Sequence, residues 1–170
     1  MPDYSVQDIH SVAIRMRRHI LTMATYGKTS HVGSALSCVE ILAVLYFRLM
    51  NVSSKNWLTP EANRFILSKG HGAKAWYAVL AEAGFISLED LDTYAQDGTY
   101  LGEHPSHCHT PGIGLSTGSL GHGLAVGAGQ AWPTTIYYSR AGKQTNVHVG
   151  SYSTLANWQH DIQQYALNSQ

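Results

Sequence analysis

The stretch Arg64-Phe-Ile-Leu-Ser-Lys-Gly-His-Gly72 joins a short apolar run to a glycine-rich turn, and apolar residues follow it at helical spacing: Trp76, Val79, Leu80 and Ala83. Strand, glycine-rich turn and helix, in that order, are typical of open α/β sheets that bind ligands at the carboxyl ends of their strands. The run at 64–67 fits a buried strand, although four residues do not separate strand from helix. We therefore predict a ligand-binding turn at 68–72.

Three further loops combine glycine with histidine. They are His31-Val-Gly-Ser34, Gly102-Glu-His-Pro105 and the long loop Gly112-Ile-Gly-Leu-Ser-Thr-Gly-Ser-Leu-Gly-His-Gly123. Glycine costs backbone entropy wherever it is ordered, so such loops are poor material for a purely structural surface. They bring bare backbone close to a ligand and direct imidazoles at it, which indicates a site for an anionic small molecule.

The segment Gly118-Ser-Leu-Gly121 precedes a helix of small residues that we expect over 120–132. Free N–H groups and the helix dipole at such a start suit a diphosphate. A tight turn before a closely packed helix explains the same residues equally well. The chain contains neither the Gly-x-Gly-x-x-Gly dinucleotide fingerprint nor a phosphate-binding P-loop.

Capping boxes predict where three helices begin. Ser5-Val-Gln-Asp8 opens a first helix that should end near Gly27, Ser37-Cys-Val-Glu40 opens a second, and Ser87-Leu-Glu-Asp90 opens a short third. The apolar residues that define the core faces of the first two are Ile9, Val12, Met16, Ile20 and Met23, then Ile41, Leu42, Leu45 and Leu49.

Composition limits the class of protein. The chain has 170 residues, a formal net charge of +0 and only 13% charged residues. Nothing in this balance favours nucleic acid or an anionic membrane, and no apolar run reaches the roughly 20 residues of a bilayer span. With no visible signal peptide and no disulfide framework from Cys38 and Cys108, we expect a cytoplasmic protein. The low charged fraction hints that a partner subunit covers part of its surface.

A metal site is the alternative for the cluster His104, His107, Cys108 and His109. Imidazole and thiolate are suitable ligands for zinc. The spacing matches no standard zinc pattern, so a surface loop is the preferred interpretation.

Taken in order, the loops resemble the amino-terminal half of transketolase, most closely its split-subunit or bacterial forms. The resemblance covers about residues 8–132 and rests on five segments: His31–Ser37, Arg64–Gly72, Tyr77–Gly84, Gly102–Pro105 and Ser116–Gly123. It implies an α/β fold, here a helix-rich and incomplete fragment of the thiamine diphosphate-binding parallel-sheet domain over residues 1–132.

The resemblance also implies site residues. His31 matches a histidine near the scissile carbon and the donor sugar, His71 one that contacts the cofactor diphosphate and the reaction centre, and His104 one that hydrogen-bonds substrate hydroxyls. The loop that lies along the cofactor through backbone groups is matched by Gly118, Ser119, Leu120 and Gly121. The extra Glu103 departs from the family's Gly-His-Pro and makes the assignment of His104 less secure.

The implied activity is transfer of a two-carbon ketol unit between sugar phosphates, with thiamine diphosphate as the electron sink. Histidine titrates near neutral pH and can donate or accept the protons that such a reaction moves. The family also uses Mg²⁺ to hold the diphosphate, and a second domain across a dimer interface activates the cofactor. A C-terminal transketolase subunit or dimer partner is therefore expected.

The resemblance stops in the tail. The family's Gly-Asp-Gly, which supplies metal ligands, is absent from the chain; Asn146-Val-His-Val-Gly-Ser151 stands in its place, and Asp161 is the sole acid after residue 132. No residue is therefore assigned to the metal. We expect a truncated chain whose polar tail, 133–170, has no strand longer than Val147–Val149 and is either frameshifted or disordered. Translation of the other two reading frames tests the frameshift, and no Gly-Asp-Gly strand in either would refute it.

Three functions remain open on the sequence alone. The chain is a thiamine diphosphate-dependent transketolase subunit that works only in a larger assembly, or a catalytically inactive remnant or non-enzymatic binding module. The weaker alternative is an enzyme like deoxyxylulose-phosphate synthase, which condenses pyruvate with a triose phosphate. The missing strands should leave apolar faces exposed and the isolated chain of low stability.

Overall fold

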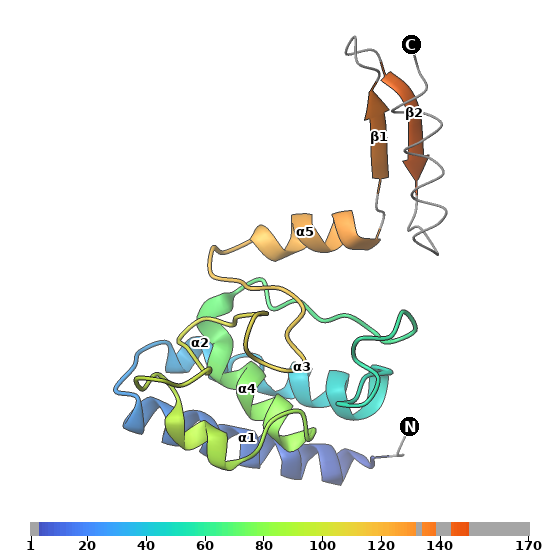
Figure 1. Cartoon of the computed structure of the whole chain (residues 1–170). Helices are drawn as coiled ribbons and strands as arrows, with labels where there is room; N and C mark the ends of the chain where they lie inside the picture. The colour runs from blue at the N-terminus through green and yellow to red at the C-terminus, as the bar shows by residue number, and fades with distance from the viewer. Residues whose placement is uncertain (1–3, 132–133, 139–143, 150–170) are drawn as a thin grey trace. The chain divides into compact units, whose positions relative to one another are not determined.

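The computed structural model describes residues 4–131, 134–138 and 144–149, with side chains through residue 130. The chain forms two compact units, Met1–Gly123 and Leu124–Gln170. The first unit contains the α-helices α1 (Val6–Tyr26), α2 (Val32–Leu36), α3 (Val39–Val44) and α4 (Ala73–Glu82), and shorter helical turns η1 (Leu45–Leu49), η2 (Gly70–Gly72) and η3 (Glu89–Thr93) (Figure 1).

Two of the three predicted capping boxes are confirmed. The Ser5 hydroxyl accepts a hydrogen bond from the N–H of Asp8 at 3.2 Å, and the Asp8 carboxylate accepts one from the N–H of Ser5 at 2.9 Å. The same reciprocal pair joins Ser87 and Asp90 at 2.9 and 3.1 Å and opens η3. Gly27 ends α1 as predicted, donating its N–H to the Met23 carbonyl at 2.9 Å.

The core face of α1 is also confirmed, because every residue predicted to point inward is buried: Ile9, Val12, Met16, Ile20 and Met23. This face packs against α3 and α4. Apolar residues that recur with a period of 3.6 lie on one face of a helix, and this pattern therefore identified the buried face of α1 correctly.

Helix α4 is buried around its whole circumference, although the sequence predicted a single apolar stripe. Every residue from Ala73 to Ala81 is buried, and the helix contacts α1, α2 and α3 (Figure 1). A helix that is covered on all sides forms the centre of its unit. The four alanines among these residues, at 73, 75, 78 and 81, let the neighbouring helices approach it closely.

The strand predicted at 64–67 is wrong, because these residues lie in irregular backbone leading to η2. A strand exists only where a neighbour pairs with it, and residues 4–131 as the structure describes them contain no strand at all. Four apolar residues were compatible with a strand but did not require one. The first unit is consequently helix-rich, as expected for a fragment of an α/β domain.

The second helix forms, but its predicted start and core face are partly wrong. Ser37 does not cap it; its hydroxyl instead donates to the Ser34 carbonyl at 3.0 Å at the end of α2, and α3 begins at Val39. The helix then continues as the π-helical turn η1. Of the predicted core face, Leu42 is buried, whereas Ile41 is 62% and Leu49 61% exposed. A π-turn holds more residues than an α-turn, so it rotates the side chains that follow it, which accounts for the exposure of Leu49 and the burial of Phe47.

The second unit contains a β-hairpin, and α5 (His122–Ala131) leads into it from the end of the first unit. Strands β1 (Thr134–Tyr138) and β2 (Gln144–Val149) pair antiparallel, with Thr134 opposite Val149. The sequence predicted no strand longer than Val147–Val149, which is wrong, and the pairing differs from the parallel sheet of the parent domain. The predictions for Asp161 and the rest of 150–170 lie outside the described residues.

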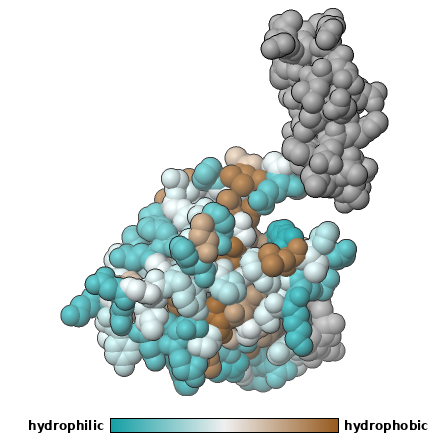
Figure 2. All heavy atoms as spheres, in the orientation of Figure 1, coloured by the Kyte–Doolittle hydropathy of each residue, from teal (hydrophilic) through white to brown (hydrophobic). Residues whose placement is uncertain are grey.

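Large apolar side chains reach the surface of the first unit at several places, among them Ile41, Leu58, Leu88 and Leu120. On the face shown in Figure 2, hydrophobic residues occur among hydrophilic and neutral ones. Exposed apolar residues are ordinary when scattered singly. None of the helices in the described part of the chain combines the length and apolar character needed to cross a bilayer.

A buried carboxylate ties the end of α4 to α1. The Glu82 side chain is 8% exposed and accepts hydrogen bonds from Nε of Arg15 at 2.9 and 3.1 Å, and Nε2 of His19 lies 2.9 Å from Oε1. Burial by itself would raise the pKa of Glu82, but the hydrogen bonds from Arg15 and His19 outweigh it and lower that pKa. The group is therefore ionised at neutral pH.

Replacement of this carboxylate by Glu82→Gln should lower the free energy of unfolding by about 1–3 kcal/mol at neutral pH, because it removes charge-assisted hydrogen bonds. The depressed pKa gives stability that is complete above the ordinary value of 4.5 and is lost as pH falls through the folded-state pKa. The difference between wild type and variant should therefore shrink in acid, as measured by urea unfolding at a series of pH values.

The matched control is Glu89→Gln, which changes an exposed carboxylate on η3 in the same way. It should leave the free energy of unfolding unchanged. A Glu82→Gln penalty that stays constant from neutral pH into strong acid would contradict the account.

Candidate functional site

Three of the histidines singled out in the sequence lie in one row. The ring centroids of His31 and His71 are 4.8 Å apart with planes at 80°, and those of His71 and His104 are 4.7 Å apart with planes at 83°. His71 is therefore the central member, in edge-to-face contact with both neighbours. Loops that are 40 and 33 residues from His71 in the sequence meet at one point.

Each histidine is positioned by a different local structure. His31 precedes α2 in the left-handed region, with φ 66°, and its carbonyl accepts a hydrogen bond from the N–H of Ala35 at 3.2 Å. His71 is the middle residue of η2, directly before α4. His104 lies on a loop whose carbonyls at Gly102 and His104 are 2.9 and 3.1 Å from the Tyr77 hydroxyl, which donates from α4.

Three buried side-chain atoms have no hydrogen-bond partner within the described residues: Oγ1 of Thr29, Nδ1 of His71 and Oγ1 of Thr117. His71 is the centre of the row, and the backbone of Thr117 packs against the neighbouring Gly70. A buried polar atom left unpaired costs about 1–3 kcal/mol, so such atoms at one place indicate a ligand that completes their hydrogen bonds. The rings of His31 and His104, in contrast, are on exposed residues.

The glycine loop lies directly against the His71 turn. A Cβ on Gly70 would be 2.3 Å from the carbonyl oxygen of Thr117 and 2.8 Å from the backbone nitrogen of Gly118, so only glycine fits. A Cβ on Gly118 would lie 3.6 Å from Cδ2 of His104. The backbone at 117–118 therefore borders both His71 and His104.

The following residues of the loop open toward solvent. Ser119, Leu120 and Gly121 are exposed, and Gly121 has a φ of +82°. At the start of α5, the N–H of Gly123 donates to the Ser68 hydroxyl at 3.1 Å. Of the four residues whose amides were expected to face an anion, Gly118 lies against the Gly70 turn and His104, and the other three lie at the surface.

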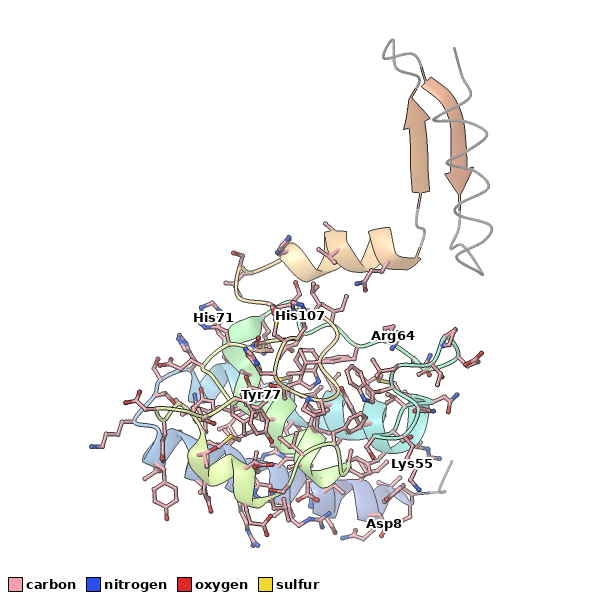
Figure 3. The ribbon with its side chains drawn as sticks, in the orientation of Figure 1. Asp8, Lys55, Arg64, His71, Tyr77 and His107 are labelled. Carbon is pink, nitrogen blue, oxygen red and sulfur yellow. The ribbon has the colours of Figure 1, made fainter. Side chains whose placement is uncertain are left out.

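The structure describes His104, His107, Cys108 and His109 without gathering them into a group of metal ligands. Through the part of the chain that the structure describes, no three or more His, Cys, Asp or Glu side chains are grouped to hold a metal ion. His107 instead donates its N–H to the Ser116 hydroxyl at 3.0 Å, and its Nδ1 lies 2.8 Å from the same oxygen (Figure 3). These bonds connect the segment around His107 to the segment around Ser116, within the surface loop that the sequence pattern favoured.

Sequence reasoning missed the residues that support the row. Tyr77 was seen only as part of a family segment, and Lys74 was not singled out, although a lysine inside an otherwise apolar helical run is a visible signal. Lys74 is 1% exposed, and its Nζ donates to the Ser30 carbonyl at 2.6 Å. Lys69, which lies within the quoted turn, donates to the Ser34 carbonyl at 2.7 Å.

Comparison with known proteins identifies the family. The family model described as the thiamine diphosphate binding domain of transketolase matches residues 10–159. The chain belongs to this family, and the resemblance to the amino-terminal section of transketolase is confirmed. The matched range continues beyond Trp132, and the domain boundary placed there stays a prediction.

Curated relatives include components of two-part transketolases. The chain is 39% identical over 160 residues to an apulose-4-phosphate transketolase subunit from Actinobacillus succinogenes, covering 91% of this chain and 56% of that protein. It is 46% identical over 129 residues to a 6-deoxy-6-sulfo-D-fructose transketolase subunit from a Clostridium species, covering 69% and 46%. The chain therefore spans about half the length of these relatives.

Solved structures support the fold class. The transketolase of Leishmania mexicana superposes with a TM-score of 0.67 and 34% identity, over 72% of this chain and 18% of that chain. The fold is thus confirmed as a helix-rich fragment of the α/β thiamine diphosphate-binding domain.

The contact between Gly70 and the glycine loop is tested by Gly70→Ala. The new methyl group would collide with the Thr117 carbonyl, so the loop must move and the free energy of unfolding should fall by about 1–3 kcal/mol. Backbone NMR shifts at Thr117 and Gly118 and thermal unfolding measure the two effects.

Gly33→Ala is the control, since nothing lies within 4 Å of its Cβ position and it sits inside α2. Alanine is favoured over glycine in a helix by about 0.5–1 kcal/mol, so this variant should be at least as stable as wild type. Unchanged stability and shifts in Gly70→Ala would refute the close contact.

Proposed function

We propose that the chain is the thiamine diphosphate-binding part of a transketolase-type enzyme that transfers a two-carbon ketol unit between sugar phosphates. The observation that carries the proposal is the row His31, His71 and His104 beside the backbone of Gly118, with an unpaired buried nitrogen on His71. Membership of the family supports it.

The residues present fit the diphosphate end of the cofactor. The backbone at Gly118, Ser119, Leu120 and Gly121 offers amides without large side chains on the glycines, and helix starts favour anions. His71, with its unpaired Nδ1, lies on the adjoining turn. These five residues would hold the cofactor, which when bound supplies an electron sink for breaking a carbon–carbon bond beside a carbonyl.

The histidines have distinct proposed roles. Because imidazole titrates near neutral pH, it can both donate and accept a proton during turnover. The exposed ring of His31 would handle the proton beside the scissile carbon, and the exposed ring of His104 would bind substrate hydroxyls. His71, half-buried between them, would contact the diphosphate and keep the two outer rings apart.

The metal does not fit in the same way. The described residues hold no metal-binding group, and the sequence contains no Gly-Asp-Gly. Without a divalent cation, a diphosphate is neutralised only by imidazoles, amides and nearby lysines. No step is therefore assigned to Mg²⁺, and this absence is what favours the alternative function, an inactive remnant or a non-enzymatic binding module.

A second polypeptide is part of the proposal. The relatives named above are themselves called transketolase subunits, and this chain spans about half of their length. The exposed rings of His31 and His104 leave one side of the row uncovered by the described residues. We infer that a C-terminal transketolase subunit or dimer partner completes the site, with sugar phosphates as the substrate class.

Calorimetric titration of the full chain with thiamine diphosphate, with and without Mg²⁺, separates the two functions. Micromolar, metal-dependent binding by the wild type would support the transketolase function, and His71→Ala should then weaken it at least tenfold, equivalent to about 1.4 kcal/mol, by removing the nitrogen beside the glycine loop. His109→Ala, which changes an exposed histidine of the neighbouring loop, should bind like wild type.

The absence of wild-type binding at millimolar cofactor would contradict the proposal and support the non-enzymatic alternative. Equal binding by wild type and His71→Ala would refute the role of His71 while leaving the family assignment intact.

A further inference from the structure

Two lysines flank the turn that carries His71, and both reach across to the segment that carries His31. Nζ of Lys69 donates to the Ser34 carbonyl and to the Ser37 hydroxyl, each at 2.7 Å. Nζ of Lys74 donates to the Ser30 carbonyl at 2.6 Å. The segment 30–37 is therefore held near both of its ends by side chains from one turn.

Lys74 is an unusual residue for its position. It is 1% exposed among the buried residues of α4, and it makes no ion pair with a carboxylate within the described residues. An ammonium group is almost never buried unless other groups compensate for its lost hydration. Here the Ser30 carbonyl accepts its hydrogen bond, and the ring of Tyr94 lies below it, 5.0 Å from Nζ to the centroid.

Burial has the larger effect on the pKa of Lys74, and a nearby carboxylate offsets only part of it. Burial lowers the pKa of Lys74, and the charge of Glu103 opposes that change. Glu103 lies directly before His104 in the sequence, so the lysine is also coupled to the third histidine loop. An apolar residue would fill the same space in α4 without this cost, which indicates that the ammonium group has a task beyond packing.

The position of the carbonyl that Lys74 binds indicates what the ammonium group does. The Ser30 carbonyl, which Lys74 binds, belongs to the peptide group that precedes His31. The His31 carbonyl belongs to the peptide group that follows it, and it accepts a hydrogen bond from the N–H of Ala35 at 3.2 Å. Both peptide planes on either side of His31 are therefore fixed. His31 has a φ of 66°, a left-handed conformation that is unfavourable for a residue with a side chain, so it needs such support.

We propose that Lys74, together with Lys69 at the far end of the segment, is a positioning residue that holds the His31 ring against His71. Lys74 is buried and acts through the backbone of Ser30, so it does not touch the ligand. The catalytic meaning of this arrangement rests on the proposed function, in which His31 and His71 act at the reaction centre. The geometry itself is independent of that function.

The test compares two imidazole contacts in one variant of the full chain. Lys74→Met keeps the length of the side chain and removes its donors. In wild type, NMR should show nuclear Overhauser cross-peaks between the rings of His31 and His71 and between those of His71 and His104, whose centroids are 4.8 and 4.7 Å apart. We expect Lys74→Met to lose the first cross-peak and retain the second.

The retained cross-peak shows that the variant is folded, because a merely structural loss would remove both. Lys55→Met is the matched control: Lys55 is exposed and lies well away from His71 (Figure 3), so both cross-peaks should remain. A folded Lys74→Met protein with both cross-peaks unchanged overturns the proposal.

Lys69→Met covers the case in which Lys74→Met fails to fold, since Lys69 is only half-buried. It should weaken the His31–His71 cross-peak while the His71–His104 cross-peak persists; two unchanged cross-peaks would overturn the proposal. Failure of the proposed function has a different signature, because wild type would then show both cross-peaks yet bind no thiamine diphosphate.

Discussion

The geometry of the site depends on the attachment of three loops to one buried helix, α4. His71 precedes its first residue, Lys74 binds the carbonyl ahead of His31, and Tyr77 binds carbonyls of the His104 loop. All of these bonds go from α4 side chains to loop backbone, so they orient the loops without using loop side chains. Because α4 is covered on all sides, the three histidines share one rigid support.

Sequence patterns found the residues of the site better than the contacts that place them. The family resemblance singled out His31, His71 and His104, whose rings the structure brings together, and the period of apolar residues identified the buried face of α1. The bond from Lys74 to Ser30 joins residues 44 positions apart, and local spacing carries no information about such a contact. Sequence patterns missed the π-turn η1 and wrongly predicted a strand at 64–67 for a related reason. Both features depend on tertiary neighbours, which override local preference.

The electrostatics of the site distinguish it from a metal centre. Its described polar groups are imidazoles, backbone amides and ammonium groups, with Glu103 as the nearby carboxylate. Dipoles and titratable rings of this kind stabilise an anion by direct hydrogen bonds, whereas a divalent cation would need a cluster of oxygen ligands. Nδ1 of His71 and Oγ1 of Thr117 are both buried and have no hydrogen-bond partner within the described residues.

The contact of Gly70 with Thr117 and Gly118 has an evolutionary consequence. Main-chain atoms alone set the distance between the Gly70 turn and the loop at 117–118. This distance therefore does not depend on the side chains of either loop. Side chains at exposed positions of these loops could therefore change in descendants without disturbing the distance between the two loops.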